Sequence, residues 1–152
     1  MKKNKIVITG GAGFVGTNLI NLFLKKTKYK IISIDNYSSG FKKNHIKNKR
    51  VNYIKEDTKN ISQILKNHKN IKSIFHFGEF ARVYQSFIKM NECINSNSIG
   101  TNSVFNYCLK NTKGINSIFH FGEFARIYQS FLKMNECIKS NSIGSNAVLT
   151  IV

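Results

Sequence analysis

The 152-residue sequence predicts a single α/β domain built on a doubly wound parallel sheet. The first observation is a β-branched run, residues 6–8, that ends in a glycine-rich turn and continues directly into an amphipathic helical pattern. The second is that further apolar runs alternate with helical segments along the chain. Parallel strands require such crossover connections, which are almost always right-handed. The length suits one domain with a substantial core.

The glycine-rich turn is the most informative segment. Gly10, Gly13 and Gly16 lie between the first strand and the helix that follows it. In such a turn the backbone N–H groups and the positive end of the helix dipole face an anion, and glycine lets a pyrophosphate approach because no Cβ intervenes. The turn predicts dinucleotide binding, with Phe14 and Val15 offering backbone N–H groups. A strand-to-helix turn without a ligand is the alternative.

A second strand, residues 30–34, ends at Asp35. This acidic residue follows Gly16 by about 20 residues, the distance at which a carboxylate hydrogen-bonds the adenosine ribose in a strand–helix–strand unit. Its charge would repel a 2′-phosphate, so the sequence predicts NAD rather than NADP. The alternative is a turn-forming aspartate that opens residues 35–40.

Together these residues resemble a known family. Residues 9–16 (Thr-Gly-Gly-Ala-Gly-Phe-Val-Gly) and 35–40 (Asp-Asn-Tyr-Ser-Ser-Gly) are similar to the start of extended short-chain dehydrogenases/reductases. The nearest group is the NAD-dependent sugar-nucleotide epimerases and dehydratases, typified by UDP-glucose 4-epimerases. The resemblance covers about residues 4–111 and implies a Rossmann-like fold of three α/β/α layers.

The resemblance also implies roles for later residues. Residues 51–57 are similar to the third strand, whose closing Asp57 would meet the adenine amino group. Residues 74–79 are similar to the fourth strand, with Phe77 and Gly78 on the nicotinamide side, although Glu79 stands where the family has alanine. The residues expected to bind NAD are Gly10, Gly13, Phe14, Val15, Gly16, Asp35, Asn36, Asp57, Phe77, Gly78 and Asn97.

Residues 73–104 recur at residues 117–148, with 27 of 32 positions identical. The repeated unit is one strand and one helix, and two copies are too few for a solenoid. The second copy is therefore expected in the slot of a fifth strand, which gives the strand order 3-2-1-4-5, with residues 133–150 as its covering helix. We expect one NAD-binding domain over residues 1–152, truncated after about five strands.

The family's chemistry, by resemblance, uses a Tyr followed four residues later by a Lys, and a Ser or Thr at the end of strand five. None of the six tyrosines has such a lysine, and residues 120–123 (His-Phe-Gly-Glu) occupy the serine position. The sequence predicts NAD binding without independent catalysis and identifies no catalytic residue. A nucleotide sugar is the expected partner of a full-length relative only. A non-catalytic truncated or duplicated product, or an interaction module, is the alternative.

The net charge of +17, from 24 Lys and Arg against 7 Asp and Glu, raises the further alternative of a polyanion-binding protein. No nucleic-acid motif accompanies the charge, so nucleic-acid binding is not expected. The absence of a long apolar run predicts no membrane span. The three cysteines suit reduced, buried thiols in a cytoplasmic protein.

Two H-x-x-E pairs, His76 with Glu79 and His120 with Glu123, are one pattern seen in both copies of the repeat. Such a pair can contribute to a metal site. A histidine at the end of a strand is usually structural, so no metal is expected.

Overall fold

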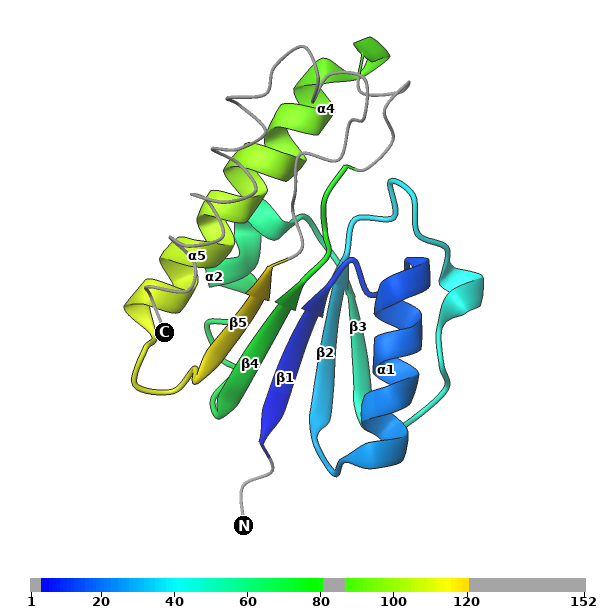
Figure 1. The fold of residues 1–152 in the computed structure, drawn as a ribbon, viewed down its shortest axis with the longest axis vertical. Helices are drawn as coiled ribbons and strands as arrows, with labels where there is room; N and C mark the ends of the chain where they lie inside the picture. Colours follow the sequence, from blue (N-terminus) through cyan, green and yellow to red (C-terminus); the bar gives the residue numbers. More distant parts are fainter. Residues whose placement is uncertain (1–3, 81–86, 121–152) are drawn as a thin grey trace, which may run out of the picture.

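The computed structural model describes residues 4–80 and 87–120. Within these residues a five-stranded sheet has the order β3-β2-β1-β4-β5, and every neighbouring pair is parallel (Figure 1). The strands are β1 (Lys5–Thr9), β2 (Lys30–Asp35), β3 (Val51–Lys55), β4 (Ile71–His76) and β5 (Ser117–His120). The predicted fold class and strand order are confirmed.

The helices connect these strands as crossovers (Figure 1). The first, α1 (Phe14–Lys26), joins β1 to β2. Between β4 and β5 one continuous helical run comprises α4 (Met90–Ile94), the π-helical η3 (Asn95–Gly100) and α5 (Thr101–Lys110). The shorter elements are η1 (Lys42–Asn44), η2 (Thr58–Asn60) and α2 (Ile61–Ile64). In the described part of the chain, no helix has both the length and the apolar character needed to cross a membrane.

Two hydrophobic clusters lie on opposite faces of the sheet and define the layers. On one face Ile6 and Ile8 of β1 pack with Ile20 of α1. On the other face Val7 packs with the cluster that holds Val104 of α5 and the apolar residues of α2. Alternate residues of β1 therefore face different helical layers, which explains its continuous apolar sequence.

The second copy of the repeat supplies β5, as predicted. It pairs with β4 so that identical residues lie opposite each other, from Ser73 and Ser117 to His76 and His120. The two serine hydroxyls are 3.1 Å apart, and the rings of Phe75 and Phe119 stack at 4.6 Å. The fourth strand ends at His76, so residues 77–79 form a loop. The predicted helix at residues 133–150 lies outside the described residues.

Candidate functional site

The glycine turn joins β1 to α1 at the carboxyl edge of the sheet. Gly10 has a φ of +68°, which L-residues with a side chain rarely adopt, and its N–H donates to the carbonyl of Ile34 at 2.8 Å. A Cβ at this position would lie 2.7 Å from the carbonyl oxygen of Phe77. Gly10 therefore lets the turn and the loop after β4 approach each other.

The other two glycines of the motif have different surroundings. A Cβ on Gly16 would lie 2.3 Å from the carbonyl oxygen of Gly10, so this buried glycine allows α1 to pack against the turn. A Cβ on Gly13 would meet only that same oxygen, at 3.2 Å. Gly13 is the N-cap residue of α1, and the first turn of the helix contains no acidic side chain. The turn therefore presents open backbone at Gly13 and close packing at Gly16.

Asp35, at the end of β2, anchors the turn. One carboxylate oxygen accepts the N–H of Ala12 and the other accepts the N–H of Tyr37, each at 2.8 Å. From η1, the side-chain amide of Asn44 donates to the carbonyl of Ala12 at 2.7 Å. The sequence did not point to Asn44, because its contact with Ala12 spans 32 residues and belongs to no local motif. Asp35 is thus a structural support of the turn as well as a candidate ligand-binding residue.

A cleft opens between the glycine turn and the loops that follow β2, β3 and β4. Six of the predicted site residues line it, namely Gly10, Gly13, Asp35, Asn36, Phe77 and Gly78. The remaining lining residues lie outside the set predicted to bind NAD; they are Ile34, Ser38, Ser39, Glu56, Thr58, Glu79 and Ser96. The cleft lies at the carboxyl ends of parallel strands, where ligands of open α/β sheets bind.

The other predicted site residues lie around this cleft. Phe14 and Val15 are 84% and 53% exposed at the start of α1, and Gly16 is buried behind the turn. Asp57 accepts hydrogen bonds from the Asn36 side chain and from a backbone N–H of η2. Asn97 bonds the backbone of Phe80 through both side-chain atoms, at 2.5 and 3.1 Å, so it holds the loop after β4.

The charged side chains among these lining residues are all acidic: Asp35, Glu56 and Glu79. Glu56 also accepts from the N–H of Asp57 and from the side chain of Asn60. Attraction of an anion into the described cleft must therefore come from backbone N–H groups and from the dipole of α1.

A hydrogen-bonded chain runs beneath one wall of the cleft. The N–H of Gly78 donates to the Thr9 hydroxyl at 3.0 Å, and that hydroxyl lies 2.6 Å from Nδ1 of His76. On the other side of the ring, Nε2 lies 3.0 Å from the Thr101 hydroxyl, which donates to Glu79 Oε1 at 3.2 Å. Because the single proton of Thr101 goes to Glu79, Nε2 of His76 is the donor and Nδ1 accepts from Thr9.

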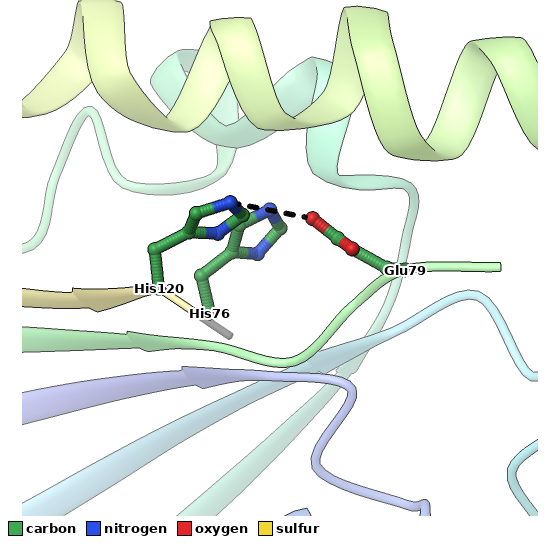
Figure 2. Close-up of side chains that lie close together, drawn as sticks. All are labelled: His76, Glu79 and His120. Atoms are coloured by element: carbon green, nitrogen blue, oxygen red, sulfur yellow. Dashed lines mark ion pairs between the residues drawn. The ribbon is translucent and has the colours of Figure 1, made fainter. Parts of the chain in front are cut away.

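This environment holds His76 neutral. Its side chain is fully buried, and burial lowers the pKa of His76 from 6.5 to about 3, with the neighbouring His120 as the second cause. Burial also raises the pKa of Glu79, while the hydrogen bond from Thr101 opposes that change. Nε2 of His120 lies 3.7 Å from Glu79 Oε1, and the two side chains are 13% and 17% exposed (Figure 2). The sequence predicted a structural His76 but not its partners Thr9 and Thr101.

Comparison with known proteins identifies the family of the chain. The model of the NAD dependent epimerase/dehydratase family matches residues 6–122. An uncharacterized protein of Methanocaldococcus jannaschii is 32% identical over 118 residues, which cover 70% of this chain and 36% of that protein.

Solved structures share the fold. The UDP-N-acetylglucosamine 4-epimerase of Methanobrevibacter ruminantium, solved in complex with UDP-N-acetylmuramic acid, is 28% identical, with a TM-score of 0.68 and coverage of 82% of this chain and 39% of that one. The Bordetella bronchiseptica enzyme WbmF, solved in complex with NAD+, has a TM-score of 0.70 at 19% identity, with coverage of 76% and 35%, and shows the fold alone. The chain spans between 35% and 39% of the length of these three relatives. With its parallel sheet, its glycine turn and the family match over most of its length, the chain belongs to the NAD-dependent epimerase/dehydratase family.

Proposed function

We propose that this chain binds NAD(H) in the cleft at the carboxyl ends of β1, β2 and β4. The observation that carries the proposal is the turn in which Gly10 adopts a positive φ and Gly13 begins α1 without a side-chain cap. The first-turn amides of α1 have no partner within the helix, and the dipole favours an anion there. Membership of the NAD-dependent epimerase/dehydratase family supports this choice of ligand.

The residues present fit the cofactor. Gly13 exposes backbone to the cleft, so the pyrophosphate would accept N–H bonds from Phe14 and Val15, with Gly16 keeping the helix close to the turn. Each oxygen of Asp35 accepts one backbone N–H and retains capacity for a ribose hydroxyl. A carboxylate at this position favours NAD over NADP because it repels a 2′-phosphate.

The remaining predicted residues complete the proposed site. Asp57, which is bonded to Asn36, would meet the adenine edge, and Phe77 with Gly78 would border the nicotinamide. Asn97 would position the loop that carries these two residues. When bound, NAD accepts and returns a hydride, and the role of the protein is to bind and orient it.

We further propose that these 152 residues do not turn over a nucleotide sugar by themselves. Support comes from the absence of a Tyr followed four residues later by a Lys, and from His120 at the end of β5, where the family resemblance leads us to expect Ser or Thr. Nucleotide sugars remain the proposed substrate class of a longer relative. We also propose a cytoplasmic location, because Cys93 and Cys108 are free thiols, the first partly buried and the second buried.

The test is calorimetric titration of the full chain with NAD+ and NADP+. Gly13→Ala places a methyl group at the proposed pyrophosphate contact and should weaken NAD+ binding by at least about tenfold, or 1.4 kcal/mol. Gly114→Ala is the matched control, because a Cβ there meets no atom closer than 3.8 Å. No heat at millimolar NAD+, or equal affinities in both variants, would refute the binding site. Turnover of UDP-glucose by the wild-type chain would refute the absence of catalysis.

A further inference from the structure

The in-register pairing of β4 with β5 brings together side chains that the sequence separates. The rings of His76 and His120 lie beside each other at the strand ends, with centroids 5.3 Å apart and planes 20° apart. Both rings rise from the sheet toward the helical layer, and Glu79 turns back from the loop after β4 to face His120 (Figure 2). One nitrogen of each histidine and one carboxylate oxygen all lie within 4.8 Å of one another.

We propose that His76, Glu79 and His120 form a binding site for one divalent transition-metal ion of the zinc class. Two imidazoles and one carboxylate are a ligand set that Zn²⁺ uses in proteins, with a fourth position left for water. Imidazole ligands favour zinc and its neighbours over Mg²⁺ or Ca²⁺, which prefer oxygen. The inference does not depend on NAD binding.

The distances require only a small contraction. Tetrahedral zinc with bonds of about 2.1 Å holds its ligand atoms about 3.4 Å apart. Nε2 of His120 and Oε1 of Glu79 are already 3.7 Å apart. The full ligand set lies within 4.8 Å, and because an imidazole binds a metal in its own ring plane, the two near-parallel rings must also tilt toward one ion.

The surrounding hydroxyls suit a ligand set of this kind. A metal-bound histidine nearly always donates its other ring N–H to an oxygen, which fixes the ring. Thr9 stands at that position, 2.6 Å from Nδ1 of His76, and has a second lone pair beside the one that accepts from Gly78. The Thr101 hydroxyl bridges the two ligands, because it bonds Nε2 of His76 and Oε1 of Glu79. In the metal-bound state the ion would replace this bridge and bind Nε2 of His76. The proton of His76 would then be on Nδ1, where it can be donated to Thr9.

The duplication explains why the three ligands are brought together only in the folded chain. Each H-x-x-E motif offers two ligands, but the strand register adds the histidine of the second copy to the pair of the first. Both copies are therefore needed for three ligands. Glu79 also lines the cleft, so the proposed metal lies at its border.

The test uses the full chain, made without a histidine tag and stripped with EDTA. Titration with Co²⁺ should give visible absorption that saturates at one ion per chain, and Zn²⁺ should displace it. Glu79→Gln preserves an acceptor for Thr101, so folding is retained, and His120→Asn removes the third ligand. Each substitution should lower Zn²⁺ affinity by more than about 100-fold. The loss of a residue that only hydrogen-bonds a metal ligand typically lowers affinity by less than that. His68→Asn is the control, because it removes an imidazole distant from the cluster.

The outcomes separate the proposed site from adventitious binding. Loss of Co²⁺ absorption in Glu79→Gln and His120→Asn, but not in His68→Asn, supports the site. No visible absorption in the wild type, unchanged affinity in the two cluster variants, or a thiolate-to-cobalt band in the near ultraviolet would overturn it. Far-ultraviolet circular dichroism in EDTA checks that each variant is folded. If His120→Asn is unfolded, Glu79→Gln alone decides the question.

Discussion

The burial of His76 predicts that metal-free protein loses stability when the solution is acidified from pH 7.5 to pH 5.0. The ring is fully buried, and both nitrogens are bonded to hydroxyls, so the folded state resists a charged imidazolium. The pKa of His76 is lowered to about 3 in the folded state, against 6.5 for a free imidazole. Unfolding therefore takes up a proton below pH 6.5.

The sign and size follow from proton linkage. The stability that a lowered pKa contributes is complete above pH 6.5 and is lost as the pH falls toward 3, by about 1.4 kcal/mol per pH unit inside that window. At pH 5.0 the contribution of His76 to the loss is about 2 kcal/mol. Glu79 acts in the opposite direction, because a raised pKa contributes stability at low pH that is lost as the pH rises. The wild type therefore loses less than His76 alone would cause.

Urea denaturation in EDTA at the two pH values isolates this contribution. His76→Gln keeps a polar side chain toward Thr9 and Thr101. On acidification from pH 7.5 to pH 5.0, its unfolding free energy should fall by about 2 kcal/mol less than that of the wild type. The pKa of His68 is also lowered by burial, but His68 is present in both proteins, so its effect cancels. Glu79→Gln removes the opposing group and should lose more stability on acidification than the wild type.

The result that would refute this reasoning is a pH difference in His76→Gln that equals the wild-type difference to within about 0.5 kcal/mol. A second measurement avoids any dependence on the stability of the variant. The imidazole resonances of His76 in the wild type should stay those of a neutral ring down to pH 4.5. Titration of the ring near pH 6.5 in folded protein would contradict the buried network directly.

Three further predictions concern the cleft. Gly10→Ala should destabilise the fold by about 2 kcal/mol or more in thermal melts, because it combines a positive φ with a contact that is too short, while Gly114→Ala should leave the melt unchanged. Asp35→Asn should lower the free energy of unfolding by about 1–3 kcal/mol, because one backbone N–H loses its acceptor. It should also reduce the preference for NAD+ over NADP+ in calorimetry, because the cleft loses a negative charge, and an unchanged preference would contradict this role. Glu79→Gln in EDTA should strengthen NAD+ binding by about threefold or more, because an acidic group leaves the border of the cleft; weaker binding would show that the carboxylate assists the ligand.

The fold could be predicted because its signals are local. The run Ile6 to Ile8 and the glycines after it define a strand, a turn and a helix start within a dozen or so residues, and apolar spacing of three and four identifies the buried face of α5 at Thr101, Val104 and Cys108. A right-handed crossover from the fourth strand then favours the sheet edge beside that strand for the copied strand. Apart from this last step, these features depend on neighbours in the chain.

The site could be predicted only in part, because its other contacts are distant in sequence. The sequence pointed to Asp35 as a ligand, but its bond to Ala12 makes it a support of the turn as well. Residues 95–100 are π-helical, which the sequence did not predict. In this segment Ser96 lines the cleft, whereas Asn97 holds Phe80.

The proposed loss of catalysis and the proposed metal site share one structural cause. A parallel strand added in register with its own copy must place identical side chains side by side, so the end of β5 carries His120 next to His76. The position where the family resemblance leads us to expect a small hydroxyl side chain is thereby filled by an imidazole that faces Glu79. The glycine turn is built from β1, α1 and the loop after β2, and none of these comes from the copied segment. Duplication can therefore change the chemistry at one end of the sheet while the dinucleotide cradle at β1 keeps its form.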